Sequence, residues 1–129
     1  MWIKYNANPV ANRVEDCAIR AVAVALNISW DDAFDLIAES AKAMAGVMHL
    51  NAVFGAVLRQ HGFERKIIPN TCPDCYTIKD FCRDNPHGVF VVGTGSHVVA
   101  VIDGDYIDSF DSGDLLAIFY WEEIRNGIQ

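Results

Sequence analysis

The chain has 129 residues, of which 52% are hydrophobic and 11% aromatic, with nine glycines and four prolines. This is the composition of a globular domain, and it excludes disordered and fibrous proteins. The net charge of -7, with ten scattered basic residues, argues against a nucleic-acid partner, because phosphate binding depends on clustered lysine and arginine. We therefore expect a single domain over residues 1–129 with one compact core.

Neither a membrane segment nor a secretion signal is visible in the sequence. No apolar run approaches the roughly 18 residues that span a bilayer, and the start MWIKYNANPV lacks a basic stretch followed by an apolar one. We therefore expect a cytoplasmic protein with no membrane partner. In that compartment the four cysteines are expected to be reduced thiols and not a disulfide framework.

The first half of the chain predicts mainly helices. The alanine-rich string AVAVAL continues an apolar stripe of helical period, Ser29 is a natural N-cap, and Gly46 is a helix stop. In chain order the expected elements are an extended or irregular start at residues 1–10, a helix that begins between residues 14 and 16, a helix from Ser29 to Gly46, a helix at about residues 51–61 and a short strand at residues 63–68.

The second half of the chain predicts β structure. After a short helix that begins at Thr77, the strings GVFVVGTG, SHVVAVIDGDYIDSF and LLAIFYW favour strands, because they are rich in Val, Ile and aromatic residues. Asp103-Gly104 is the strongest hairpin signal, since a type I′ turn needs positive φ at both central residues. Helices followed by such strands predict an α+β fold with N-terminal helices packed on a C-terminal antiparallel sheet.

Two residues have the pattern of a cysteine nucleophile and its base. Cys17 falls in the first turn of the first expected helix, where the helix dipole and the unpaired amides favour thiolate over thiol. His97 follows the string GTGS and opens a strand, so its imidazole is expected at a strand end. A strand end can face a helix N-terminus across a cleft, which would bring the base to the thiol.

The hairpin adds an acid to this pair. With a two-residue Asp-Gly turn, Ile102 pairs with Asp105, and Asp108 lies diagonally beside His97 on the same face of the sheet. Asp108 can therefore orient the imidazole. Asp111 is an odd number of residues from Asp108, so its side chain is expected on the other face of the sheet, and it ranks second as the orienting acid.

Simpler interpretations compete with a catalytic one. A lone cysteine in an alanine-rich helix is more often a buried core residue, and a lone histidine in a strand is usually structural. From spacing alone the nucleophile and the core-thiol interpretations are about equally supported, because a loose Cys-His-Asp pattern does not transfer between families. A weaker alternative is a zinc site, whose ligands would be Cys72, Cys75, Cys82 and His87.

Three strings carry a resemblance to a known family. DCAIRA at residues 16–21, GSHVVAV at residues 95–101 and YIDSFD at residues 106–111 resemble the small papain-like cysteine peptidases of bacterial and phage genomes. The order Cys, His, then Asp, with the cysteine on the leading helix and the others on the following sheet, is similar to the arrangement of that superfamily. The resemblance spans nearly the whole chain in order.

The resemblance implies a papain-like fold and a cysteine-dependent hydrolysis or transfer of an amide bond. It makes Cys17 the nucleophile, His97 the general base and acid, and Asp108 the orienting group, with a peptide or protein substrate and without cofactor or metal. The family's oxyanion glutamine has no counterpart, since Ala11 stands at that position, and Asn12 is the nearby side-chain amide that could take its role. This departure favours the rival interpretation, a non-catalytic binding or inhibitor module on a papain-like scaffold.

Overall fold

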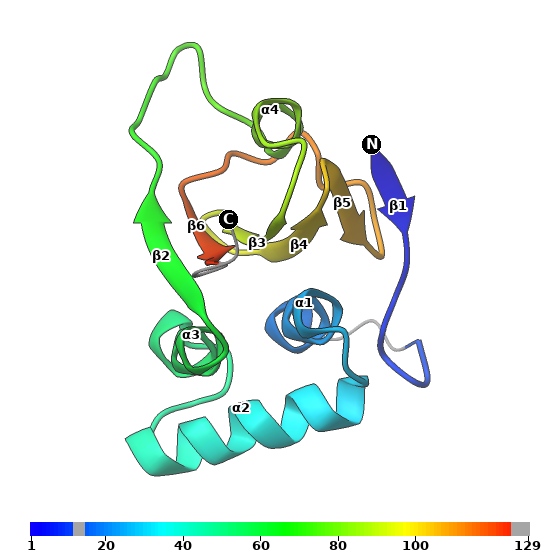
Figure 1. Ribbon diagram of the computed structural model, residues 1–129, viewed down its shortest axis with the longest axis vertical. Coiled ribbons are helices and arrows are strands. Elements are labelled where there is room, and N and C mark those ends of the chain that lie inside the picture. The colour runs from blue at the N-terminus through cyan, green and yellow to red at the C-terminus, as the bar shows by residue number, and fades with distance from the viewer. Residues whose placement is uncertain (12–14, 125–129) are drawn as a thin grey trace.

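The computed structural model describes residues 1–11 and 15–124. It has the predicted α+β class, with helices and strands distributed along the chain (Figure 1). In chain order the elements are β1 (Trp2–Lys4), α1 (Cys17–Leu26), α2 (Trp30–Met44), α3 (Asn51–Gln60), β2 (Phe63–Ile67), α4 (Ile78–Asp84), β3 (Val89–Gly93), β4 (Val98–Ile102), β5 (Asp105–Asp108) and β6 (Phe119–Glu123).

The strands form one mixed sheet in the order β1-β5-β4-β3-β6-β2 (Figure 1). The prediction of a C-terminal antiparallel sheet is therefore wrong in two respects. The sheet also contains β1 from the start of the chain and β2, which matches the short strand predicted at residues 63–68, and β1 pairs in parallel with β5, Trp2 opposite Tyr106. The reason is that β1 has only three residues and follows no strong alternation, so its sequence carries little of the signal that identifies a strand.

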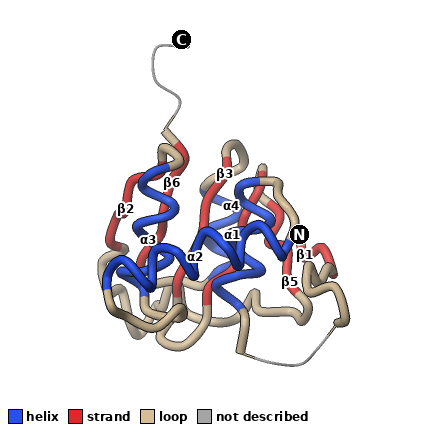
Figure 2. Tube along the Cα trace, turned by 90° about the horizontal axis from the view of Figure 1, so that it is seen from below, coloured by secondary structure: helices blue, strands red, loops and turns tan. Residues whose placement is uncertain are grey.

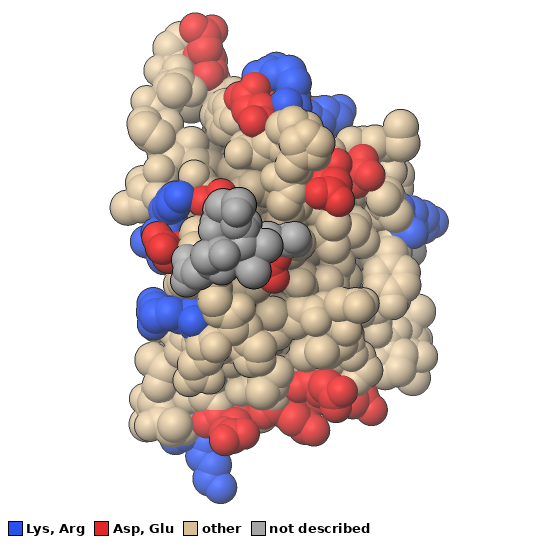
Figure 3. Space-filling view, in the orientation of Figure 1, with Lys and Arg blue, Asp and Glu red and all other residues tan. Residues whose placement is uncertain are grey.

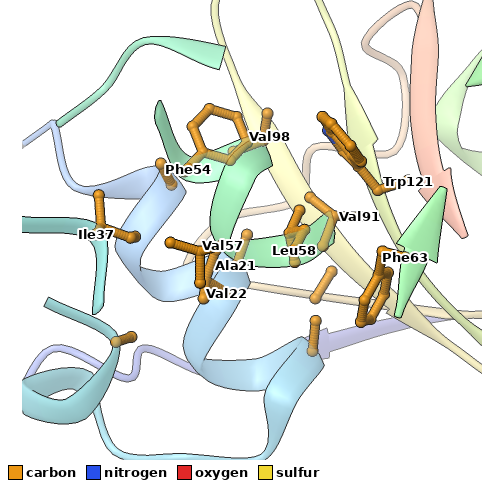
Figure 4. Close-up of a cluster of buried hydrophobic side chains, with 14 of the residues drawn as sticks. Ala21, Val22, Ile37, Phe54, Val57, Leu58, Phe63, Val91, Val98 and Trp121 are labelled. Atoms are coloured by element: carbon orange, nitrogen blue, oxygen red, sulfur yellow. The ribbon is translucent and has the colours of Figure 1, made fainter. Parts of the chain in front are cut away.

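The helices cover the two faces of the sheet unequally. Helices α1, α2 and α3 lie on one face and α4 lies on the other (Figures 1 and 2). The larger apolar cluster lies beneath α1, α2 and α3, and its side chains meet the sheet as Figure 4 shows. The members labelled there are Ala21, Val22, Ile37, Phe54, Val57, Leu58, Phe63, Val91, Val98 and Trp121.

Local sequence accounts for how the helices begin and end. Ser29 caps α2 by accepting a hydrogen bond from the amide of Asp32, as predicted. Thr77 and Asp80 form a reciprocal capping box that starts α4. Asn27 ends α1 in the left-handed conformation that asparagine tolerates better than most residues.

The hairpin between β4 and β5 has the predicted turn and register. Asp103 and Gly104 both have positive φ, at 50° and 83°, and Ile102 lies opposite Asp105. Both parts of that prediction are confirmed. The last strand, in contrast, begins at Phe119 and not at the start of LLAIFYW, because Leu115, Leu116 and Ile118 lie in an exposed segment before it.

The cysteine prediction is wrong for two of the four residues. Cys72 and Cys75 form a disulfide in the loop between β2 and α4, and only Cys17 and Cys82 are free. The physical reason is proximity, since the C-P-D-C turn holds the two Cα atoms 4.2 Å apart. The expectation of reduced thiols came from the missing secretion signal, which carries no information about two cysteines that are neighbours in one turn.

The acidic excess of the sequence, a net charge of -7, is visible on the surface. Acidic side chains gather along the lower edge of the face in Figure 3, over α2, while basic side chains on this face are dispersed. Among the described residues, no helix is both long and apolar enough to cross a membrane.

Candidate active site

Cys17 is the first residue of α1 and is partly buried. The residue before it, Asp16, occupies the N-cap position but makes no side-chain hydrogen bond to the helix backbone. The first amides of a helix lack intrahelical partners and carry partial positive charge, which stabilises an anion beside them. The sulfur therefore lies where a thiolate is favoured.

His97 immediately precedes β4 and is held there by Thr94. The Thr94 hydroxyl accepts hydrogen bonds from the amides of Ser96 and His97, at 3.3 and 3.0 Å, and the Thr94 amide donates to the His97 carbonyl at 2.8 Å. Gly93 begins this turn with no room for a side chain, because a Cβ there would overlap the ring of Phe119. The turn therefore fixes the start of β4 and with it the imidazole.

The structure brings Cys17, His97 and Asp108 together. His97 Nε2 lies 2.6 Å from Asp108 Oδ2, and Cys17 and His97 line the same cavity close enough for the imidazole to lower the pKa of the thiol. Because Asp108 engages Nε2, Nδ1 is the ring nitrogen left for the sulfur. Asp111 is directed elsewhere, to the hydroxyl of Tyr106 and the amide of Gly113. Asp108 is thus the aspartate that orients the ring.

The electrostatics of the pair favour a thiolate beside an imidazolium. Burial by itself raises the pKa of Cys17, but the hydrogen bond with His97, the backbone of Val98 and the charges of His97 and Arg20 outweigh it, so the pKa lies below its usual value. Burial lowers the pKa of His97, yet the bond to Asp108 and the contact with Cys17 outweigh it and raise the pKa to about 9. The two groups titrate as a coupled pair.

Asp108 is held as an ionised carboxylate by four donors. Burial raises its pKa, but the bond from His97, the Ser112 hydroxyl at 2.8 Å and the Ser109 amide at 2.8 Å outweigh burial and lower it. The fourth donor is Arg20 Nη1, at 3.1 Å from Oδ1. Oδ2 faces the histidine and Ser112 while Oδ1 faces Arg20 and Ser109, so the carboxylate has one orientation available.

A largely buried polar network continues from Asp108 behind Cys17, and the sequence interpretation assigned it no role. Arg20 Nε donates to Asp16 Oδ1 at 2.8 Å. The other oxygen of Asp16 accepts from Asn8 Nδ2 and from Trp30 Nε1, each at 3.0 Å. The available signal was the i,i+4 spacing of Asp16 and Arg20, which puts them on one helix face.

A cavity of about 620 Å³ opens at the thiol. Cys17 and His97 line it together with Glu15, the loop before α3 and the turn before β4. Apolar wall comes from Phe54 of α3 and from Phe110, whose ring centroid lies 4.9 Å from that of His97. A cavity of this size, with apolar walls and several polar side chains, is typical of a substrate site.

The predicted oxyanion residue, Asn12, lies outside the described residues. The nearest described side-chain amide in that segment is Asn8, which is buried and committed to Asp16 and to the amide of Val10. The described part of the chain therefore offers the backbone amides at the start of α1 as oxyanion donors.

The alternative zinc site is not formed. Cys72 and Cys75 are joined to each other, and Cys82 is buried in α4, where burial raises its pKa to about 11. Among residues 1–11 and 15–124, no group of three or more potential metal ligands lies together. A thiol whose pKa is raised by burial is a poor metal ligand, because metals bind the thiolate.

Comparison of the chain with protein-family models, with curated proteins and with solved structures gave no match.

Proposed function

We propose that this protein is a cysteine-dependent hydrolase or acyltransferase that acts on an amide bond, with a papain-like architecture. The observation that carries the proposal is the chain of contacts from the Cys17 thiol through His97 to Asp108 at the wall of a cavity of about 620 Å³. A nucleophile, a base and a group that orients the base are the components that thiol catalysis requires.

The papain-like part of the proposal is supported by the order and placement of the three residues. The nucleophile begins the leading helix, α1, which packs on the central strands, and the histidine and aspartate come from strand ends that follow it in the chain. This is the arrangement that the strings DCAIRA and GSHVVAV resemble in the papain-like peptidases.

The reaction follows from the protonation states of the pair. The Cys17 thiolate attacks the carbonyl carbon of the substrate, the carbonyl π electrons move to oxygen, and the backbone amides at the start of α1 stabilise the oxyanion. As the tetrahedral intermediate collapses, the C–N bond breaks and His97 gives its Nδ1 proton to the leaving amine. Water, or an amine in a transfer reaction, then attacks the thioester while His97 takes back a proton, and the thiolate leaves.

Acylation by p-nitrophenyl acetate tests the proposal without knowledge of the natural substrate. We expect a burst of p-nitrophenolate equivalent to one thiol per chain, and acetylated Cys17 in the peptide mass spectrum. A peptide library derived from a proteome, analysed for new termini, then tests amide cleavage. His97→Ala should suppress both reactions, and His87→Ala, a change of an exposed histidine outside the cavity, is the matched control.

Two results would contradict the proposal. The first is acetylation spread over the free thiols without preference for Cys17, and the second is an acylation rate that His97→Ala leaves unchanged. Either result would favour the rival interpretation, a non-catalytic binding module on the same scaffold.

A further inference from the structure

Arg20 joins two carboxylates that belong to different parts of the site. Its Nε donates to Asp16, which precedes the nucleophile, and its Nη1 donates to Asp108, which orients the histidine. The same Nη1 also donates to the Ser109 hydroxyl at 3.0 Å. The side chain of Arg20 is 13% exposed, against 5% for Asp16 and 2% for Asp108, so the group is largely shielded from water.

The planar guanidinium has a geometric effect that a point charge lacks. Its N–H groups are fixed in one plane, so the positions of Asp16 and Asp108 are set relative to each other. Asp16 is further anchored by Asn8 and by Trp30 of α2, and this leaves it little freedom to move. Besides the packing of α1 on the sheet, this one side chain therefore links the start of α1 directly to the end of β5.

We infer that Arg20 is a positioning residue of the active site, which holds the Asp108 carboxylate in register with the helix that carries Cys17. The inference rests on the proposed function. Arg20 acts through Asp108 and His97 and not on the reacting atoms. A displacement of about 1 Å at a catalytic group can cost on the order of a hundredfold in rate, so a single clamp of this kind has a measurable effect.

The charged groups around Arg20 determine how a mutation would act. Asp16 and Cys17 face it from the start of α1, Asp108 from the end of β5, and His97 from the turn before β4. The positive charge of Arg20 is one of the causes that lower the pKa of Cys17. A change at Arg20 can therefore act by charge or by position, and the two effects must be separated.

Two substitutions separate these effects, with p-nitrophenyl acetate as the substrate. Arg20→Lys keeps the positive charge but loses the planar guanidinium that binds both carboxylates, and we expect kcat to fall about tenfold. Arg20→Gln loses both, and we expect a fall on the order of a hundredfold. Since Arg20 also borders the cavity, KM is measured in parallel and should change by less than about twofold if the residue positions and does not bind substrate.

The pH dependence of Cys17 alkylation by iodoacetamide gives a second readout that needs no turnover. If Arg20 positions the site, both variants weaken the hold of Asp108 on the imidazolium, so the pKa of His97 falls and that of Cys17 rises. The two limbs of the alkylation profile then approach each other, and the pH window between them, in which the thiolate–imidazolium pair exists, narrows. If Arg20 acts by charge alone, Arg20→Lys keeps the wild-type window. In that case Arg20→Gln shifts both limbs together to higher pH, because loss of a cation raises both pKa values.

Arg83 provides a matched control. It also joins two carboxylates, those of Asp80 and Asp84, each at 3.1 Å, but it lies on α4 at the other face of the sheet. Arg83→Lys and Arg83→Gln should leave kcat and the alkylation window unchanged.

The inference is overturned if Arg20→Lys keeps the wild-type kcat and the wild-type alkylation window, or if the Arg20 variants change KM alone. It is also overturned if the Arg83 variants lose kcat to the same extent as the Arg20 variants. Circular dichroism and thermal melting establish that each variant is folded. Failure of both Arg20 variants to fold would also overturn it, because Arg20 would then be required by the fold as a whole. If wild-type protein is not acylated at Cys17 but the alkylation windows differ as expected, the proposed function fails and the positioning role stands.

Discussion

The two free thiols, Cys17 and Cys82, lie on opposite faces of the sheet, and their pKa values are shifted in opposite directions. Cys17 packs beside the cluster under α1, α2 and α3, while Cys82 belongs to the cluster under α4. Burial raises the pKa in both places. At Cys82 burial dominates and the pKa reaches about 11, whereas at Cys17 the partners reverse the shift.

The difference shows what turns a core cysteine into a candidate nucleophile. Cys82 lies in the last turns of a short helix among apolar neighbours, and its thiol has no cationic partner close enough to offset burial. Cys17 lies at a helix start, contacts His97 and borders a cavity. Burial raises the pKa of both thiols, so the opposite net shifts come from the helix start and from the histidine beside Cys17.

The largest expected effect is the loss of the thiol itself. Cys17→Ala should reduce the rate of p-nitrophenyl acetate hydrolysis by at least about a thousandfold, because the covalent step disappears. Cys82→Ala is the control and should retain the wild-type rate. Equal loss in the two variants, measured by p-nitrophenolate release, would remove the functional distinction between the faces.

The next effect concerns the base. His97→Ala should lower kcat/KM by about 10²- to 10⁴-fold, since general acid–base catalysis contributes that much and the thiolate also loses its partner. The variant should make Cys17 respond to burial as Cys82 does, with a raised pKa. Alkylation of Cys17 measured across pH should then begin only at or above the pH at which ordinary thiols ionise, and persistence of a fast reaction at lower pH would contradict this prediction.

The two aspartates of the same segment give a smaller and sharper contrast. Asp108→Asn should lower kcat on the order of a hundredfold, because a neutral amide cannot stabilise the imidazolium and its NH2 group cannot accept from the four donors that now surround the two carboxylate oxygens. Asp111→Asn, which removes a partner of Tyr106 outside the triad, should change kcat by less than about twofold. Steady-state kinetics of both variants test whether the aspartate on the same face of the hairpin as His97 is the one that supports catalysis.

The smallest expected effect is on stability. Cys82→Ala should lower the free energy of unfolding by about 1 kcal/mol, because it removes a buried sulfur from the α4 cluster and leaves a small void. Urea unfolding followed by circular dichroism measures the change. A loss of activity without loss of stability would mean that the α4 face contributes to the site.

Much of the fold and the site follows from local sequence, and the rest depends on contacts distant in the chain. Ser29, Thr77 and Asp103-Gly104 specify helix starts and a turn through their own geometry, so they were predictable. Parity in the hairpin placed Asp108 beside His97. The parallel pairing of β1 was not predictable, because a three-residue strand has no pattern of its own.

The network around Arg20 shows the same limit at the site. The i,i+4 spacing of Asp16 and Arg20 was visible, but the bond from Arg20 to Asp108 joins residues 88 positions apart. Trp30 and Asn8 complete the network from two further segments, and nothing in their local sequence marks them as partners of Asp16. Long-range polar contacts of this kind depend on the assembled core.

The proposal that His97 holds Cys17 as a thiolate is tested most sharply by the pH dependence of alkylation, measured for each cysteine separately. The protein is treated with iodoacetamide across a range of pH, and the label on Cys17 and Cys82 is quantified by peptide mass spectrometry. We expect Cys17 to react below the pH at which ordinary thiols ionise, with a second limb near pH 9 where His97 loses its proton. Cys82 should stay unlabelled until the protein unfolds, because it is buried and its pKa is raised. A single limb for Cys17 at the pH of an ordinary thiol, unchanged in His97→Ala, would contradict it.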